Sequence, residues 1–567
     1  MNRSKIGLML VAALVISSFA SAQDGDLISR SGFEIRTPEG LGDAGNFLLR
    51  TTYGPTPSEV ANVQAVGFED WVDAQLALAP TLHRPQLEAY GIDIGHGERQ
   101  RVWFDTAQDA PDQLRQRVAF ALSEILVVSD VNGTLEGQPL AVAEYYDILL
   151  RNAFGNYRDL LEEVTLTPTM GIYLSMFRST RDPLLGIEPD ENYAREIMQL
   201  FSIGLHLLNN DGTPQLDGMG QKIPTYQQPH IVALAEAFTG WNFANADNGD
   251  GDCEPWEWQW PEWNFLEPME PCVVTNPNPG QPDDYHVTTE KTIVGDVTLP
   301  AGQTAEQDME QALDTLFEHQ NVGPFIAYRL IQRLVTSNPS PGYVDRVASV
   351  FNDNGIGMRG DLGAVVRAIL LDPEALDGHL MTSTFGKLKE PLLMVTHLWR
   401  VYDAEINPVF AADRSCCWPG AIYVPQWWFS QAALRSPSVF NFFKPDYSPP
   451  GAILNAGLVA PEFQIATDTQ VMDVANFFFD TLVNQPPPNF PWQTEHQIDI
   501  AALQSIASNA TLLVQTINDD LMFGQLDAVS EQLIIDRIED IDVSETTQRV
   551  TEAIYFVFTS PASLVQR

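Results

Sequence analysis

The sequence predicts a mainly α-helical protein, with one large multi-helix globular body, long irregular loop insertions and few short strands. Apolar residues recur at three- and four-residue spacing in segments spread along the 567 residues, which is the pattern of amphipathic helices. Alternating, strand-like runs are rare, and 291–299 is the clearest of them. No Gly/Ser-rich linker, internal repeat or low-complexity tract divides the chain. These three observations favour a single helical body.

The first 22 residues have the features of a signal peptide. Arg3 and Lys5 precede the apolar run LMLVAALVISSFA, and Ala20-Ser21-Ala22 supplies the small residues of a cleavage site. The apolar run is too short for a comfortable membrane span, and no later segment reaches the ~20 apolar residues that would cross a bilayer. We therefore expect an exported protein, periplasmic or extracellular, without a membrane span.

After this signal we expect a flexible lead at 23–45 and a single helical domain at 46–567. Two irregular segments interrupt the helical pattern, an acidic, Trp-rich loop insertion at 242–290 and a Pro- and aromatic-rich region at 403–461. Long loops in compact proteins are usually functional or disordered. The helical segments, in chain order, are 113–129, 143–154, 157–164, 189–205, 230–241, 322–336, 343–351, 362–372, 389–402 and 546–558.

The chain is strongly acidic, with 75 Asp and Glu residues against 31 Lys and Arg and a formal net charge of −44. Nucleic acid and anionic lipid are poor partners for such a surface, because phosphate binding relies on clustered Lys and Arg. Lysine is scarce, yet Lys387 and Lys389 stand together in FGKLKEP. We expect salt bridges, or apolar stems packed along the surface, for these lysines.

Four cysteines in an exported chain favour disulfides. Cys253 and Cys272 close a short loop, and Cys416 and Cys417 are neighbours in the sequence. The local pairing, 253 with 272 and 416 with 417, does not require cysteines that are far apart in the sequence to meet in the fold. A bond between adjacent residues is strained, because a trans peptide holds their Cα atoms ~3.8 Å apart. Free or cross-paired thiols are the alternatives.

The segment 189–205, PDENYAREIMQLFSIGL, is the first candidate for a functional site. Read as one helix with Asp190 as N-cap and Gly204 at its end, it gathers its polar side chains on one face, either a surface network or the wall of a site. Around that face these are Glu191, Ser202, Arg195, Gln199, Asn192 and Glu196. As a site wall, its catalytic candidates are Glu191, Arg195 and Glu196, and its substrate-binding candidates are Asn192, Gln199 and Tyr226.

Three further helices carry a carboxylate among apolar neighbours, at Glu124, Glu144 and Glu236. A buried carboxylate needs a cation, a hydrogen-bond network, a raised pKa or a metal. A transition-metal site in a helix bundle would use Glu-x-x-His, which these helices lack. Ion pairs are therefore favoured, and no cofactor is firmly implied. The available cations are Arg115, Arg117, Arg151 and Arg195.

The loop 246–265, ADNGDGDCEPWEWQWPEWNF, is the second candidate. Its aspartates resemble calcium ligands but lack EF-hand spacing. The loop is therefore either a Ca²⁺ site or a solvated acidic turn. Its tryptophans alternate with glutamates and form either a glycan-binding platform or an apolar contact that fixes the loop to the helical body. The residues are Asp247, Asp250 and Asp252 for the metal, and Trp256, Trp258 and Trp260 for the glycan.

Eight motifs together resemble the bacterial exported family catalogued as domain of unknown function 1800, from about Asn46 to the C-terminus. The motifs are NFLLRTTYGPTPSEV, RQRVAFALSEILVVS, NAFGNYRDLLEEVTLTPTMGIYLS, PDENYAREIMQLFSIGL, LIQRLVTSNPSPGYVDRVASVF, RGDLGAVVRAILLDPEA, FGKLKEP and PSVFNFFKPDYSPPG. The resemblance implies a mostly helical exported protein without established activity. It also implies a genomic neighbour similar to sulfatases or phosphatases, and it supplies no catalytic residues.

Two classes of function follow. We favour an extracytoplasmic enzyme that acts on a glycan or another polymer through the carboxylate and arginine cluster of 189–205. The enzyme hypothesis also places His286 in the substrate cleft. It predicts a pocket that joins the helix at 189–205 to Glu124 and Tyr226. The alternative is a non-catalytic binding or accessory protein for a secreted or surface partner, such as the sulfatase- or phosphatase-like neighbour. Its contact surfaces would be the Trp-rich loop and the region around Cys416.

Overall fold

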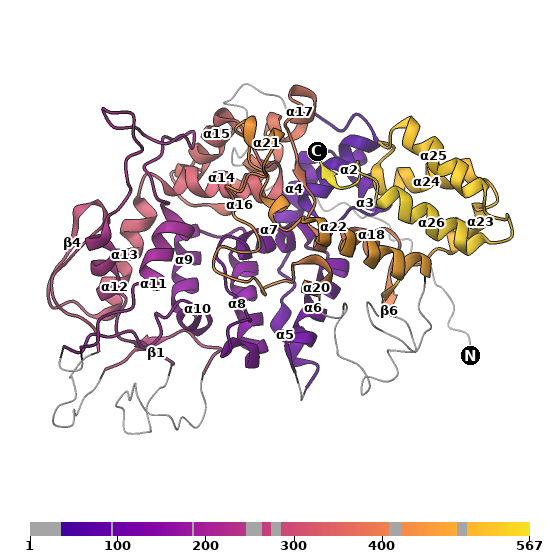
Figure 1. The fold of residues 1–567 in the computed structure, drawn as a ribbon. Helices are drawn as coiled ribbons and strands as arrows, with labels where there is room; N and C mark the ends of the chain where they lie inside the picture. The colour runs from indigo at the N-terminus through magenta and orange to yellow at the C-terminus, as the bar shows by residue number, and fades with distance from the viewer. Residues whose placement is uncertain are drawn as a thin grey trace, which may run out of the picture.

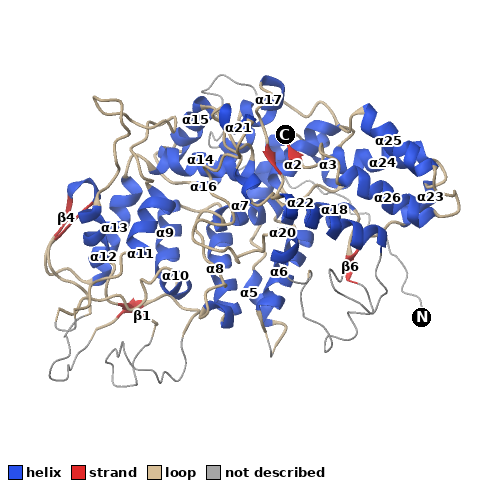
Figure 2. Cartoon of the chain, viewed as in Figure 1, coloured by secondary structure: helices blue, strands red, loops and turns tan. Residues whose placement is uncertain are grey.

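The computed structural model describes residues 36–91, 94–183, 186–244, 264–273, 285–406, 422, 425–484 and 496–567. The described helices form one elongated body, with β4 near one end and α23 near the other (Figure 1). Helices dominate, and strands occur only as short pairs (Figure 2). This confirms the mainly α-helical fold class that the sequence predicts.

The N-terminal helices are α2 Leu41–Thr51, α3 Pro57–Val66, α4 Phe68–Leu76, α5 His83–Glu88, α6 His96–Asp109, α7 Gln113–Ser123 and α8 Pro139–Asn152. The central helices are α9 Tyr157–Leu166, α10 Pro168–Tyr173, α11 Asn192–Glu196, α12 Gln228–Ala237, α13 Ala305–Glu318, α14 Val322–Leu334, α15 Pro341–Asn352, α16 Leu362–Leu371 and α17 Pro373–Met381. The C-terminal helices are α18 Pro391–Val401, α20 Pro425–Phe429, α21 Ala452–Asn455, α22 Asp468–Phe478, α23 Ala501–Ile506, α24 Ala510–Met522, α25 Ala528–Glu539 and α26 Thr546–Phe558.

Short helical turns and strand pairs complete the described part of the fold. The 3₁₀ turns are η1 Leu135–Gly137, η3 Val294–Asp296 and η4 Pro461–Gln464, and the π-helical segments are η2 Ile197–Ser202 and η5 Phe479–Asn484. The strands pair antiparallel as β1 Trp241–Asn242 with β2 Glu270–Pro271, β3 Lys291–Ile293 with β4 Val297–Leu299, β5 Lys387–Leu388 with β8 Val565–Gln566, and β6 Glu405–Ile406 with β7 His496–Gln497. The predicted strand run 291–299 is thus a small hairpin.

Several helices begin where the sequence places a hydroxyl or carboxylate before proline. Thr56 accepts a hydrogen bond from the N–H of Glu59 at the start of α3. Ser340 does the same for α15, and Asp372 for α17. In each case the next residue is proline, whose missing N–H costs nothing in the first turn. These capped starts place the helix boundaries within the chain.

One apolar core runs through the described residues, from Ala44 in α2 to Phe558 in α26. Two glycines allow the first helices to approach the last ones. A Cβ atom on Gly45 would lie 2.1 Å from the ring of Phe523, and one on Gly54 would lie 2.2 Å from the Cα atom of His397. The N- and C-terminal helices are therefore packed into one body.

Among the described residues, no helix combines the length and apolar character needed to cross a bilayer.

Some predicted boundaries differ from the observed ones. The helix predicted at 113–129 ends at Ser123, and the first described helix begins at Leu41, inside the segment 23–45 predicted as a lead. The signal peptide lies outside the described residues, as do most of the acidic insertion and residues 407–421. Export and the domain division therefore stay predictions.

A network of buried charges crosses this core. Lys387 Nζ, fully buried, lies 2.9 Å from Glu462 Oε1 and 3.5 Å from Glu390 Oε1, and it donates to the carbonyl of Arg333 at 2.9 Å. Gln431 Nε2 donates to Glu390 Oε2 at 2.6 Å. Burial opposes the ionisation of Glu390, but Lys387 and two arginines outweigh it and lower the pKa of that carboxyl.

The same network includes Glu124 at the end of α7. Arg333 Nη1 lies 3.5 Å from Glu124 Oε2, and Asn441 Nδ2 donates to Glu124 Oε1 at 3.1 Å. Arg333 also lies over the ring of Phe443, and Arg117 donates to the Arg333 carbonyl at 2.9 Å. Burial, with the Glu390 carboxylate adding to it, raises the pKa of Glu124 to about 8. Three cations and three carboxylates therefore share one interior.

Four of the eight sequence motifs meet in this network. RQRVAFALSEILVVS supplies Arg117 and Glu124, and LIQRLVTSNPSPGYVDRVASVF supplies Arg333. FGKLKEP supplies Lys387 and Glu390, and PSVFNFFKPDYSPPG supplies Asn441. Segments more than 300 residues apart in the chain are joined here, so the network is a major tertiary constraint.

Replacing Glu124 by Gln should change how stability depends on pH. The folded-state pKa of about 8 lies above the ordinary value of 4.5. The contribution of Glu124 to stability is therefore present below pH 4.5 and is lost as the pH rises through 8. The amide does not ionise, so the stability of Glu124→Gln relative to wild type should improve by about 2 kcal/mol between pH 6 and pH 9. Denaturant unfolding at both pH values measures this difference.

The exposed Glu539 in α25 gives the control, because Glu539→Gln should leave the difference between the two pH values unchanged. A relative stability of Glu124→Gln that stays constant from pH 6 to pH 9 would show that Glu124 is already ionised at pH 6.

Candidate functional site

The predicted helix at 189–205 is divided into two kinds of helix. It begins as the short α-helix α11 and continues as the π-helix η2, in which the hydroxyl of Ser202 donates to the carbonyl of Ile197, five residues earlier. Ser202 is fully buried and its hydroxyl is satisfied within the helix, so Ser202 is not exposed on this face. π-Helical segments are rare and occur frequently at functional sites.

Glu196 is the last residue of α11 and the most unusual carboxylate of this segment. Only 6% of the residue is exposed, and its Oε2 atom is buried without a hydrogen bond from any described residue. Burial raises the pKa of the Glu196 carboxyl, against the opposing effect of Arg195. A carboxyl that holds its proton more tightly than usual is suited to proton donation near neutral pH.

Two half-buried tyrosines lie close enough to Glu196 to respond to its charge. Burial, with Glu196 adding to it, raises the pKa of Tyr226 to about 12. Burial and Glu196 also raise the pKa of Tyr173 to about 12, while a hydrogen bond with Ser436 acts in the opposite direction. Both phenols therefore stay neutral at physiological pH and can donate hydrogen bonds.

The exposed side of the predicted face carries an ion pair. Arg195 Nη2 lies 2.8 Å from Glu191 Oε2, as the i,i+4 spacing predicts, and Gln228 donates to both Glu191 oxygens. Gln199 is half-buried and accepts a long hydrogen bond of 3.4 Å from the hydroxyl of Tyr226. Asn192 is exposed at the start of α11. The described structure thus joins Tyr226 to this face, as the sequence analysis expects.

The segment around Ser436 connects this site to the buried network. Ser436 is buried, contacts Tyr173, and accepts a hydrogen bond from the hydroxyl of Ser129 at its carbonyl. Leu434 and Asn441, on either side of Ser436, have positive φ angles of 56° and 63°. Left-handed backbone at residues other than glycine is costly and is held by its surroundings, commonly at functional sites.

The other predicted carboxylates are neutralised by arginine. Glu144 lies 2.9 Å from Arg84 and 2.7 Å from Arg151, the latter a predicted partner. Glu236 pairs with Arg181 at 3.2 Å instead of one of the predicted arginines. Within the described ranges, no group of three or more His, Cys, Asp or Glu side chains is placed to hold a metal ion.

His286 belongs to a different cluster. Its Nε2 atom lies 2.9 Å from Asp308 Oδ2, which also binds Lys291 Nζ at 2.6 Å, and all three side chains are buried. This cluster holds the β3–β4 hairpin against α13. The partners of Glu124 are likewise those of the buried network, so the described contacts do not join it to Glu196.

The second predicted site lies outside the described residues. Its calcium candidates Asp247, Asp250 and Asp252, its glycan candidates Trp256, Trp258 and Trp260, and Cys253, Cys416 and Cys417 all belong to that part of the chain. Cys272 is described and buried, at 3% exposure. The Ca²⁺ site, the glycan platform and the disulfide pairing stay predictions.

Sequence reasoning missed Tyr173 and Ser436. Tyr173 lies in NAFGNYRDLLEEVTLTPTMGIYLS and Ser436 directly precedes PSVFNFFKPDYSPPG. The only signal available was membership of, or adjacency to, these motifs, because nothing in their spacing indicates that they meet beside Glu196.

The comparisons with known proteins give a family but no function. The family model described as "Protein of unknown function (DUF1800)" matches residues 46–565. This confirms the resemblance drawn from the eight motifs. No curated protein and no solved structure matches the chain.

Glu196→Gln should stabilise the protein at pH 7, by up to about 1 kcal/mol, because the amide avoids a buried charge that no described donor satisfies. The folded-state pKa of Glu196 is raised, so its contribution to stability is lost as the pH rises through that value. The stabilisation by Glu196→Gln should therefore shrink toward zero as the pH falls below 4.5, the ordinary pKa of Glu. Denaturant unfolding at pH 4 and pH 7 tests both statements.

The matched control is Glu191→Gln, which breaks the ion pair with Arg195 and should cost about 0.3–1 kcal/mol at pH 7. If Glu196→Gln also destabilised the protein at pH 7, favourable interactions would be holding the Glu196 carboxylate ionised.

Proposed function

The chain belongs to this family of proteins of unknown function, and we propose that it is an exported enzyme that cleaves a glycan or another extracytoplasmic polymer with Glu196 as proton donor. The observation that carries the proposal is the Glu196 carboxyl, which is almost fully buried, has a raised pKa and lacks a donor at Oε2. A buried carboxyl of this kind lowers the stability of the fold, and a catalytic role would explain why the protein has it.

The roles of the neighbouring residues follow from their contacts. Glu196 donates its proton to the oxygen of the bond that breaks, which avoids release of an alkoxide. The Glu191 carboxylate, fixed by Arg195 and Gln228, accepts a proton from the water that attacks the other side of that bond. The neutral hydroxyl of Tyr173 donates a hydrogen bond to the substrate, and the hydroxyl of Tyr226, which donates to Gln199, orients that amide.

The charge of the chain narrows the substrate class. A formal net charge of −44 repels polyanions, so neutral and cationic polymers are the appropriate substrates. Gln199 and Asn192, on the accessible side of α11 and η2, supply the amides that bind hydroxyl groups.

One observation favours the alternative, a non-catalytic accessory protein for a secreted or surface partner such as a sulfatase- or phosphatase-like neighbour. Large apolar side chains are exposed in the stretch 427–479, which overlaps the region predicted as a contact surface, and exposed apolar groups are typical of protein interfaces. They are Trp427, Phe440, Leu454, Phe463, Val471, Met472 and Phe479.

The enzyme proposal is tested on the full-length mature protein with a panel of neutral and cationic polysaccharides and peptidoglycan. Release of new chain ends is measured by reducing-sugar assay and mass spectrometry. We expect Glu196→Gln to lower kcat by about 10²–10⁴-fold, the usual contribution of a general acid, with a smaller effect on KM. Wild-type activity should fall as the pH rises through the folded-state pKa of Glu196.

Glu539→Gln, on an exposed face of α25, is the control and should retain full activity. Equal activity of wild type and Glu196→Gln would remove Glu196 from the mechanism. A panel without any product, combined with capture of a defined exported partner by the 427–479 surface, would favour the accessory role.

A further inference from the structure

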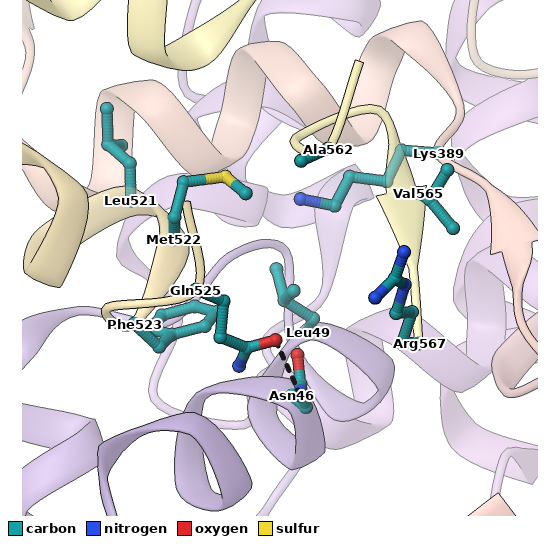
Figure 3. A pocket seen from close by; sticks show the side chains of 10 residues that line it. All are labelled: Asn46, Leu49, Lys389, Leu521, Met522, Phe523, Gln525, Ala562, Val565 and Arg567. Carbon is teal, nitrogen blue, oxygen red and sulfur yellow. Dashed lines mark hydrogen bonds between the residues drawn. The ribbon is translucent and has the colours of Figure 1, made fainter. Parts of the chain in front are cut away.

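A small cavity lies between α2, the end of α24 and β8 (Figure 3), and Glu196 is not among its lining residues. Its polar lining comes from Asn46, Lys389, Gln525 and Arg567, and apolar side chains of α2, α24 and the C-terminal segment complete the wall. No Asp or Glu is among its described lining residues. The cavity is small and is partly open to solvent.

Lys389 is the unusual residue of this cavity. It is only 8% exposed, and its ammonium points into the cavity (Figure 3). Its backbone N–H donates to the carbonyl of Leu564 at 2.8 Å, which fixes the segment beside the C-terminal strand. Within the described part of the chain, the Lys389 ammonium has neither an ion pair nor a hydrogen bond. Burial lowers the pKa of Lys389 to about 8, so the amine is still mostly protonated at pH 7.

The other buried lysines show what Lys389 lacks. Lys387, two residues earlier, is paired with Glu462 and Glu390, and Lys291 is paired with Asp308 at 2.6 Å. In a chain with 75 acidic residues, a carboxylate partner is easily provided within the protein. An ammonium without one, on a side chain that is largely buried, depends for its solvation on what occupies the cavity.

The remaining polar groups of the cavity are suited to an anion. The guanidinium of Arg567 faces the same space, while its backbone carbonyl accepts a hydrogen bond from Arg50 at 2.5 Å (Figure 3). Asn46 donates to Gln525 at a long 3.4 Å. Two cationic groups thus face the same space, and apolar side chains form the rest of the wall (Figure 3).

We propose that this cavity binds the carboxylate of a small organic acid, with Lys389 and Arg567 as its cationic partners and the apolar wall against its hydrocarbon part. A carboxylate supplies the charge that the two cations lack and accepts the bidentate hydrogen bonds that a guanidinium offers. The site is separate from Glu196 and does not depend on the function proposed there.

Sodium butyrate is the probe, and butyramide, which has the same shape without the charge, is its control. Selective ¹⁵Nζ labelling of lysine in the full chain gives few signals, because lysine is scarce. We expect butyrate to shift the Lys389 signal saturably at constant ionic strength, while butyramide and sodium chloride leave it in place. Lys389→Met should weaken butyrate binding tenfold or more in calorimetry. Lys444→Met, at an exposed lysine, should bind as wild type does.

A Lys389 signal that does not saturate with butyrate would overturn the proposal, as would equal responses to butyrate and butyramide or to butyrate and chloride. The wild-type titration decides this even where Lys389→Met fails to fold. If the variant folds and binds butyrate with unchanged affinity, Lys389 is not a ligand of the anion.

Discussion

The buried network of Arg117, Arg333, Lys387, Glu124, Glu390 and Glu462 is the constraint on which the rest of the structure depends. Each of these groups would be costly to bury alone. Glu124 keeps its proton up to about pH 8, and the others lie beside an opposite charge in the same interior. Apolar contacts alone would allow several arrangements of so many helices. Charges that must meet specific partners restrict the chain to the arrangement in which α7, α14, β5 and η4 come together.

This constraint also reaches the candidate site, through the segment 430–443. Gln431 is fixed by Glu390 and Asn441 by Glu124, and Ser436 between them contacts Tyr173 beside Glu196. The positive φ angles of Leu434 and Asn441 are sustained because both ends of the segment are held in this way. The orientation of Tyr173 is therefore set by a network that does not itself touch Glu196. A site supported by buried, satisfied contacts is better ordered than one carried by a free loop.

Interactions between residues close in the sequence could be predicted, and interactions between residues far apart in the sequence could not. Amphipathic periodicity predicts α7, α8, α9, α12, α14, α15, α16, α18 and α26, and i,i+4 spacing predicts the pair of Glu191 with Arg195. No periodicity distinguishes the π-helix from an α-helix, so the change of helix type at Ile197 could not be predicted. The partner of Lys387 is Glu462, 75 positions away, and Ser436 meets Tyr173 across more than 260 positions. A single sequence carries no information about such pairs.

Glu124 and Glu196 show why a raised pKa alone does not identify a functional carboxyl. Both carboxyl groups are buried, and burial raises the pKa of each. In both residues Oε2 is buried without a hydrogen bond from a described residue. Glu124 receives a hydrogen bond from Asn441 at its other oxygen and lies 3.5 Å from Arg333, inside the core. The neighbours of Glu196, which are Tyr173, Arg195, Gln199 and Tyr226, are only half-buried. The difference lies in what is within reach of a substrate, and on that ground Glu196 is the better candidate for chemistry.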